Sequence, residues 1–253
     1  YTVSTFAGNA GVSGSNDGQG TTASFNNSVG VALDSNGNVY VGDTSNQLVR
    51  KIDSSGNVTT LAGQKGVSGF ADGQGTNASF GSLRGVAVDS SFNVYVADRN
   101  NHIIRVIDSS GNVTTLAGEA GISGSTNGQG TTAKLNKPND VAVDSLGNVY
   151  VADKENHLIR KIDSGGNVTT LAGQAGVSGS TNGQGTTAKF NSPYGVAVDS
   201  SGNVYVSDKG NHLIRKINYS GNVTTLAGLD GVSGSSDGNG TNARFNSPYG
   251  VAV

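Results

Sequence analysis

Short apolar segments recur along the chain, and polar links that contain glycine separate them. One run reads GVAVD (195–199), NVYVSD (203–208), HLIRKI (212–217) and NVTTLAG (222–228). These segments are rich in Val, Ile, Leu, Tyr and Thr, which favour β-strands. The links carry Asp, Ser, Gly and Asn, which favour tight turns. The pattern therefore predicts four consecutive antiparallel strands and shows no helical periodicity.

The four-segment pattern repeats with a period of 55 residues. Each repeat ends on TTLAG or STFAG, with final glycines at Gly8, Gly63, Gly118, Gly173 and Gly228. The complete units are 9–63, 64–118, 119–173 and 174–228, and a partial unit covers 229–253. Four-stranded units with a period of about 40–55 residues are typical of β-propellers. We therefore expect residues 1–253 to form a single all-β propeller domain, with one four-stranded antiparallel blade per complete unit.

One connection in each unit is long, about 20 residues in the stretch QAGVSGSTNGQGTTAKFNSPY (174–194). Loops of this length are usually functional or packed by their own side chains. A recurring aromatic residue or leucine is expected to anchor the loop on its blade. These anchors are Phe25, Phe80, Leu135, Phe190 and Phe245.

Both ends of the chain are predicted to form single strands of incomplete blades. Thr2–Gly8 matches the last strand of a unit, and Gly250–Val253 matches the first. These strands cannot pair directly, because the two missing central strands leave a gap of roughly 10 Å. We therefore expect the chain to belong to a longer one, or another chain to complete the blade. Open strand edges also favour self-association.

Composition adds a few limits on partners and chemistry. The net charge of −2 gives no electrostatic reason to expect a nucleic acid or an anionic membrane as partner. No apolar run approaches the roughly 18 residues needed to cross a bilayer. The chain contains no cysteine, which excludes disulfides and thiolate metal sites and is compatible with an extracellular or cell-surface location. We therefore expect neither nucleic-acid binding nor membrane insertion.

The histidines recur once per unit at the start of the predicted third strand. They are His102, His157 and His212, and Gln47 takes this position in the first unit. A catalytic group is normally needed once, so a repeated residue that glutamine replaces is expected to be structural. The predicted partners are the aspartates that end the preceding strand. These are Asp43, Asp98, Asp153 and Asp208.

The arginines at Arg50, Arg105, Arg160 and Arg215 have the same period and are expected to pair with acidic or carbonyl groups between blades. The Gly-Gln-Gly loops open no predicted helix and precede no lysine, unlike a phosphate-binding loop. No calcium-loop spacing and no serine-hydrolase elbow is present. We therefore expect no catalytic residue, no metal site and no cofactor.

Residues that break the repeat are better candidates for function. They gather on the predicted face that holds the long loop and the turn between the second and third strands. Aromatic and arginine residues near a channel mouth are good binding anchors. We predict a ligand site there, formed by Arg84, Arg99, Asn139, Lys154, Tyr194, Lys209 and Tyr249.

The repeat resembles the NHL repeat. The pattern DGQGTTASF…GVALDSNGNVYVGD…NQLVRKI (17–52) has its layout, and Asn-His-Leu itself stands at 156–158 and 211–213. The resemblance covers essentially the whole chain and implies a propeller. NHL proteins serve as protein- or RNA-binding platforms, extracellular modules and, in a minority, enzymes such as an amidating lyase. The fold therefore does not determine the function.

We expect a non-catalytic extracellular module with a binding or structural role, whose ligand is a protein or a glycan. Three alternatives stay open. The chain is a subunit of a filament or oligomer in which a neighbour completes the blade. It is a propeller enzyme of the lyase or lactonase kind, with a metal and acid–base groups on the axis. It is a recently amplified or engineered array without a selected ligand, since the third and fourth units are nearly copies.

Overall fold

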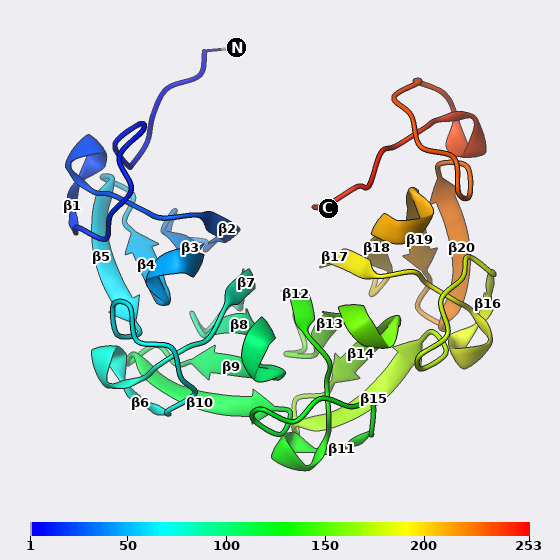
Figure 1. The fold of residues 1–253 in the computed structure, drawn as a ribbon, viewed down its shortest axis with the longest axis horizontal. Helices are drawn as coiled ribbons and strands as arrows, with labels where there is room; N and C mark the ends of the chain where they lie inside the picture. Colours follow the sequence, from blue (N-terminus) through cyan, green and yellow to red (C-terminus); the bar gives the residue numbers. More distant parts are fainter. Residues whose placement is uncertain (1) are drawn as a thin grey trace.

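The computed structural model describes residues 2–253 and shows four blades in an open arc (Figure 1). In the first blade the strands are β1 (Gly18–Gln19), β2 (Ser28–Leu33), β3 (Val39–Asp43), β4 (Leu48–Ile52) and β5 (Asn57–Ala62). The sheet order is β1-β5-β4-β3-β2, so β2 lies innermost. The prediction of an all-β propeller with antiparallel blades is confirmed. The structure adds a two-residue strand, β1, which the long loop supplies to the outer edge.

The other three blades repeat this topology. The second has β6 (Gly73–Gln74), β7 (Leu83–Val88), β8 (Val94–Asp98), β9 (Ile103–Ile107) and β10 (Asn112–Ala117). The third has β11 (Gly128–Gln129), β12 (Pro138–Val143), β13 (Val149–Asp153), β14 (Leu158–Ile162) and β15 (Asn167–Ala172). The fourth has β16 (Gly183–Gln184), β17 (Pro193–Val198), β18 (Val204–Asp208), β19 (Leu213–Ile217) and β20 (Asn222–Ala227). Each sheet therefore lies within one 55-residue unit.

Three-residue 3-10 helices fill two links in the repeat. In the long loops they are η1 (Gly20–Thr22), η3 (Gly75–Asn77), η5 (Gly130–Thr132), η7 (Gly185–Thr187) and η9 (Gly240–Asn242). Between the second and third strands of the meander they are η2 (Thr44–Asn46), η4 (Arg99–Asn101), η6 (Lys154–Asn156) and η8 (Lys209–Asn211). Within residues 2–253, no helix has the length and hydrophobicity needed to cross a membrane.

The hydrophobic core lies between neighbouring blades. Tyr150 and Ile159 of the third blade pack in one buried cluster with Phe190, Val196 and Val206 of the fourth. Strand residues of both faces are buried in this way, which explains apolar runs such as VYV. Each such side chain contributes about 1.5–3 kcal/mol when it is removed from water. Contacts between blades therefore hold the arc together.

The predicted anchors of the long loop are confirmed in the three central cases. Phe80, Leu135 and Phe190 are fully buried, whereas Phe25 and Phe245 near the ends of the arc are partly buried. The loop is therefore packed onto the blade that follows it.

The predicted terminal strands are wrong. Thr2–Gly8 and Gly250–Val253 form no strand in the described chain, and they lie on either side of the opening of the arc (Figure 1). A strand needs a neighbour for its backbone hydrogen bonds. Neither segment has the adjacent strand that would complete its blade.

Candidate ligand site at the channel mouth

A buried Arg–Asp–Asn cluster fixes the loop face of every blade. In the third blade, Arg160 is fully buried, and its Nη1 donates to Asp153 Oδ2 at 3.0 Å. Asn156 Nδ2 donates to the same oxygen at 2.7 Å. Burial raises the pKa of Asp153 to about 6, and the charge of Arg160 opposes this shift. The cluster therefore consists of charges that are compensated inside the blade.

The same arginine also holds the long loop. Arg160 Nη1 donates to Lys134 O at 3.0 Å, and Nη2 donates to Asn127 Oδ1 at 2.8 Å. All these partners lie in the unit 119–173. The expectation that the arginines pair with acidic and carbonyl groups is confirmed, but the expected place between blades is wrong. The Nη donors of this buried arginine find the nearest loop carbonyls, and these belong to its own unit.

The histidines are hydrogen-bonding groups between blades, and their predicted aspartate partners are wrong. The Nδ1 atoms of His102, His157 and His212 accept backbone N–H groups of the next unit, from Lys137, Ser192 and Ser247, at 2.9–3.0 Å. Each histidine has a left-handed backbone, with φ of 59–61°, at the end of a 3-10 helix. That conformation directs the ring toward the next blade, whereas Asp98, Asp153 and Asp208 bind Arg and Asn side chains.

Glutamine does not reproduce this link in the first unit. Gln47 has the same left-handed backbone, but its Nε2 donates locally to Thr44 O at 3.3 Å. Burial lowers the pKa of His102 and His157. Lys137 and Arg99 add to this effect at His102, whereas Glu155 opposes it at His157. Both imidazoles are therefore suited to accept a hydrogen bond in their neutral form.

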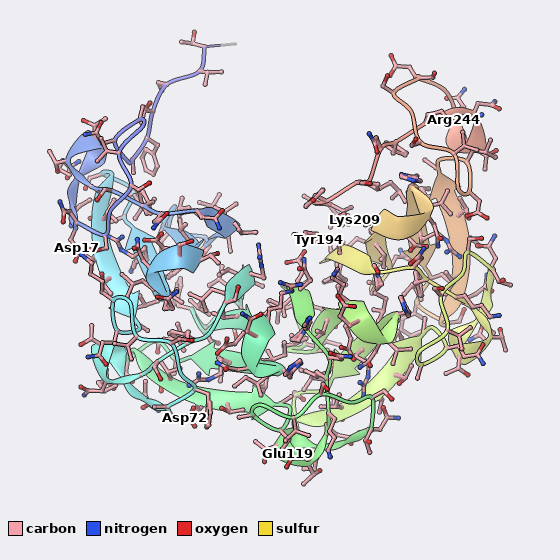
Figure 2. The ribbon with its side chains drawn as sticks, in the orientation of Figure 1. Asp17, Asp72, Glu119, Tyr194, Lys209 and Arg244 are labelled. Carbon is pink, nitrogen blue, oxygen red and sulfur yellow. The ribbon has the colours of Figure 1, made fainter. Side chains whose placement is uncertain are left out.

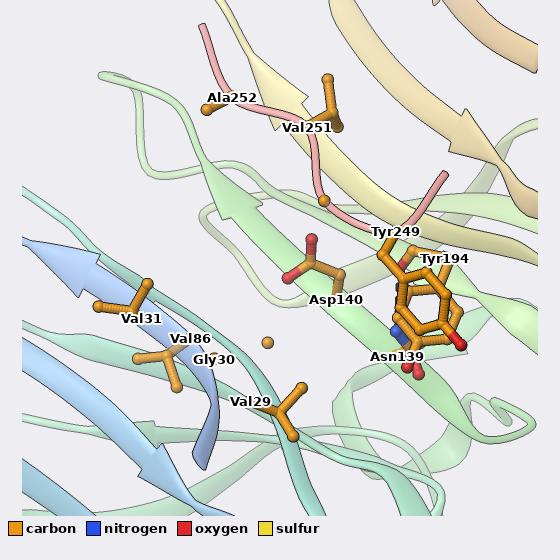
Figure 3. Close-up of a pocket in the computed structure, with 12 residues that line it drawn as sticks. Val29, Gly30, Val31, Val86, Asn139, Asp140, Tyr194, Tyr249, Val251 and Ala252 are labelled. Carbon is orange, nitrogen blue, oxygen red and sulfur yellow. Dashed lines mark hydrogen bonds between the residues drawn. The ribbon is translucent and has the colours of Figure 1, made fainter. Parts of the chain in front are cut away.

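The inner ends of the blades surround a cavity of about 480 Å³ (Figure 3). Its walls include Val29 and Val31 of β2 and Val86 of β7. Tyr194 of β17 and Tyr249 of the C-terminal segment line it as well. We call this space the channel cavity. Its size is in the usual range of ligand sites, which is roughly 300–1,000 Å³.

Two tyrosines and a lysine meet at the edge of the channel cavity. The rings of Tyr194 and Tyr249 lie edge to face, with centroids 4.4 Å apart. Lys209 Nζ lies 4.8 and 4.3 Å from the two centroids and 3.0 Å from Tyr249 Oη. Figure 2 shows Tyr194 and Lys209 on the inner part of the fourth blade. Aromatic rings stabilise a cation in this position.

Positive charge surrounds these tyrosines. The hydrogen bond from Lys209 lowers the pKa of Tyr249, and the charges of Lys209, Arg84 and Lys154 add to the shift. Lys154 also forms an ion pair with Glu155 at 2.6 Å. This contact lowers the pKa of Glu155, and the charge of Arg99 adds to the shift. In the described chain, the Nε atoms of Arg84 and Arg99 are buried without a hydrogen-bond partner. The charges of Arg84, Lys154 and Lys209 therefore act on Tyr249, whereas the charge of Arg99 acts on Glu155 and His102.

Asn139 differs from the other predicted site residues. Its side chain is buried, and Nδ2 donates to Tyr194 O at 2.9 Å. The amide therefore joins β12 to β17 and supports the tyrosine. Of the predicted site residues, Asn139, Tyr194 and Tyr249 line the channel cavity. The other four, Arg84, Arg99, Lys154 and Lys209, are not among the residues that line it.

The sequence prediction missed Asp140. This residue lines the channel cavity, and its carboxyl accepts the N–H groups of Val141 and Val196, each at 3.0 Å. Burial raises its pKa to about 7. A signal was available, because the other units have glycine at this position, namely Gly30, Gly85, Gly195 and Gly250.

The site thus combines an apolar wall, two tyrosines and the Asp140 carboxyl. We call the nearby cations Arg84, Arg99, Lys154 and Lys209 the rim. Among residues 2–253, no group of three or more His, Cys, Asp or Glu side chains is arranged to hold a metal ion. The arrangement is suited to non-covalent binding of a ligand with acidic groups.

A family model described as NHL repeat matches residues 25–52, 135–162 and 190–217. These segments run from the loop anchor through the third strand of the meander in the first, third and fourth blades. The equivalent residues 80–107 form the same strands in the second blade.

The chain matches parts of two longer curated relatives. Protein SUPPRESSOR OF QUENCHING 1, chloroplastic, from Arabidopsis thaliana is 31% identical over 262 residues, covering 76% of this chain and 25% of the relative. NHL repeat-containing protein 2 from Homo sapiens is 39% identical over 98 residues, covering 38% of this chain and 14% of the relative. The chain spans a quarter or less of the length of either relative.

Solved structures share the architecture. A Bacteroides thetaiotaomicron protein of unknown function aligns with a TM-score of 0.60 at 25% identity, over 99% of this chain and 70% of its own. An auxiliary nutrient binding protein from the same species gives 0.59 at 19% identity, over 98% and 70%. A chain of a nidogen–laminin complex gives 0.61 at 19% identity, over 89% and 68%. The last two similarities concern the fold alone.

Proposed function

The chain is a β-propeller of the NHL-repeat family, and from this premise we propose that it is a non-catalytic module that binds an acidic segment of another protein. The observation that carries the proposal is the convergence of repeat-breaking residues at one place. Tyr194, Lys209 and Tyr249 contact one another at the channel mouth. The charges of Arg84 and Lys154 lower the pKa of Tyr249 further. The scaffold residues, by contrast, recur in each blade.

An acidic protein segment fits the charges and the aromatic residues at the mouth. The rim presents Arg84, Arg99, Lys154 and Lys209 and one nearby carboxylate, Glu155. Arginine pairs with carboxylates through two parallel hydrogen bonds, and neither Arg84 nor Arg99 forms an ion pair among the described residues. Tyrosine and arginine are also the residues that dominate binding energy in protein interfaces. We place this interaction outside the cell or at its surface. The chain contains no cysteine, so the oxidising conditions there have no thiol to act on.

The repeat itself supplies mild substitutions for the test. Arg84→Asn introduces the residue that stands at Asn139, and Lys209→Thr introduces the residue that stands at Thr44. Lys161→Val is a matched control on β14, because Val106 occupies the equivalent position. Each variant therefore carries a residue that the same scaffold already contains elsewhere.

Calorimetric titration with a hexaglutamate peptide at low and high salt provides the measurement. We expect the parent to bind, and each mouth variant to lose about tenfold in affinity, as for one charge-assisted contact. Lys161→Val should bind like the parent. Equal binding by all variants, or binding of a hexauronate oligosaccharide but not of the peptide, contradicts the proposal.

Self-association is a second candidate, favoured by two uncovered blade faces. Val31 on β2 is 68% exposed, although its equivalents Val86 and Val141 are 6% and 3% exposed at internal interfaces. At the other end of the arc, Ile214 is partly exposed, whereas Ile159 is fully buried. The two faces are the complementary halves of each internal interface, so they fit head to tail.

Light scattering after size-exclusion chromatography tests this association. We expect the apparent mass to rise with protein concentration, and Val31→Asp to abolish the rise by placing a charge in the contact. A parent chain that stays monomeric at all concentrations rules out this candidate.

A further inference from the structure

Asp140 is a single exception in a row of glycines that line the channel cavity. A side chain at the glycine position of one blade points at the inner strand of the next. A Cβ at Gly30 would collide with Arg84 O, and one at Gly85 would collide with the Asp140 carboxyl. Gly85 therefore leaves the space that the Asp140 carboxyl occupies. Figure 3 shows this carboxyl in the middle of the space that the cavity residues surround.

Asp140 has no cationic partner. In each blade of the scaffold, the buried aspartate forms an ion pair with an arginine of the same blade, as Asp153 does with Arg160 at 3.0 Å. The Asp140 carboxyl accepts two backbone N–H groups, one on each oxygen. No ion pair of Asp140 is present among the described residues. A carboxylate has about four acceptor positions, so about two of those of Asp140 have no partner among the described residues.

The walls next to Asp140 are apolar and aliphatic. Val29, Val31, Val86 and Val251 line the same cavity. An ionised carboxyl in such surroundings is costly unless an opposite charge approaches it. A hard divalent cation usually takes six or more oxygen ligands, whereas this wall offers one carboxyl. An organic cation with an alkyl stem satisfies the carboxyl and the valines together.

We propose that the channel cavity binds an aliphatic primary ammonium group, with its head on the Asp140 carboxyl and its stem on the valine wall. The mouth then contacts whatever acidic group the ligand carries at its other end. This inference rests on the proposed function in one respect, because both place a ligand at the channel cavity. The ammonium site itself needs no contact with the rim.

Binding of the ammonium is linked to pH. Tyr194 on β17 and Tyr249 line the same cavity, and the charges of Arg84, Lys154 and Lys209 act on Tyr249. None of these groups is among the causes of the pKa shift of Asp140. The shift in the pKa of Asp140, to about 7, arises from burial and is opposed by the two backbone N–H groups. An ammonium ligand favours the ionised carboxyl, so binding at pH 7 releases about half a proton. Affinity falls as the pH drops below 7, because the carboxyl becomes protonated.

Two variants separate charge from packing. Asp140→Asn keeps the shape and an oxygen that accepts the Val196 N–H, but it removes the charge. Asp140→Gly restores the residue of the other units, whose inner strands already pack around glycine. Thermal unfolding by circular dichroism shows whether both variants are folded, and at least one must be folded for the binding test.

The binding test uses n-butylammonium chloride, sodium hexanoate and 6-aminohexanoate, followed by calorimetry and by NMR shifts at Val86 and Val196. We expect n-butylammonium to bind the parent, with about tenfold or greater loss in both Asp140 variants. Hexanoate has no ammonium group, so Asp140→Asn should not weaken its binding. Repeating the titration in buffers of different ionisation enthalpy should reveal proton release in the parent alone.

The outcomes distinguish this inference from the proposed function. An absent response to n-butylammonium, or a response that Asp140→Asn leaves unchanged, overturns the ammonium site. If 6-aminohexanoate binds more tightly than n-butylammonium and Arg84→Asn removes the difference, both the ammonium site and the acidic mouth contact are supported. If the two amines bind equally and both need Asp140, the ammonium site stands and the mouth proposal fails.

Discussion

The Arg–Asp–Asn cluster of each blade and the channel cavity hold their carboxyl groups in opposite ways. In the cluster, Asp153 contacts Arg160 and Asn156, and equivalent groups recur in all four blades. In the channel, Asp140 occurs once and has two backbone N–H partners and no cation. The pKa of Asp153 is raised to about 6, and that of Asp140 to about 7.

The difference separates scaffold from site. A compensated cluster inside each unit stabilises the blade wherever the unit stands in the arc. An uncompensated carboxyl destabilises the protein in its ionised form, so it is favourable only when something outside the chain compensates it. The predictions below test this contrast, from the largest expected effect to the smallest.

Removing the arginine of one cluster should have the largest effect. Arg160→Met leaves the Asp153 carboxyl buried without its cation, and the free energy of unfolding should fall by about 3–5 kcal/mol. Urea denaturation measures the change. Lys161→Met on the same strand is the control, with an expected change within about 0.5 kcal/mol.

Adding Asp153→Asn to Arg160→Met should recover part of the loss, because the buried charge is then gone. A loss below about 1 kcal/mol in Arg160→Met would show that the cluster is not a main stabilising element.

Asp140 should destabilise the folded chain at high pH. The pKa of its carboxyl is raised from 3.8 to about 7 in the folded chain. The protonated carboxyl therefore costs the folded chain nothing below pH 3.8, and the free energy of unfolding falls as the pH rises from there through 7 and the carboxyl ionises. Asp140→Asn should therefore match the parent at pH 4 and exceed it by about 2 kcal/mol at pH 8, with solvent in the channel reducing the full effect. Denaturation curves at both pH values decide this. A constant difference between parent and variant would argue against an uncompensated carboxyl.

The link between blades should have an intermediate effect. His157→Ala removes the acceptor of the Ser192 N–H and should lower the free energy of unfolding by about 1 kcal/mol. Gln47→Ala is the control, because Gln47 has the same backbone conformation and only a local hydrogen bond. Equal losses in the two variants would mean that the contact between blades adds nothing.

The outermost partner of the arginine should matter least. Arg50 and Arg105 contact Asp17 and Asp72, whereas Arg160 contacts Asn127 at the equivalent position. Asp17 and Asp72 lie on the outer side of the arc and are about half exposed (Figure 2). Asp17→Asn should therefore cost at most about 1 kcal/mol, and 1 M salt should abolish the difference. A larger loss that persists in salt would place this contact with the buried pairs.

The blades could be predicted from the sequence because each strand shows its own local pattern. Segments such as GVAVD and NVYVSD have strand composition, and the fixed period joins them into one repeated unit. The terminal segments have the same composition but form no strand, since a strand also needs a neighbour. Local pattern therefore predicts an element only where its partners are present.

The contacts of the repeated polar residues were harder to predict. The histidine ring reaches the next blade because of a left-handed residue at the end of a 3-10 helix. Arg160 meets carbonyls of a loop 26–34 residues earlier in the chain. Repetition showed that these residues are structural, but spacing did not identify their partners.

The candidate site was partly visible in the differences between units. These differences identified Tyr194, Lys209 and Tyr249, which the structure places in contact. The same comparison of units would have identified Asp140 among glycines. Its burial and its lack of a counter-ion depend on how inner strands approach one another, which the residue types alone do not reveal.

Each sheet begins and ends within one 55-residue unit, so a boundary between units never cuts through a sheet. Gene duplication or recombination at these boundaries can therefore add or remove whole blades without leaving a half-built one. The near identity of the third and fourth units fits such a history of copying. The circumference of the channel in an array of this kind can therefore change by whole blades, as well as its lining by point substitution.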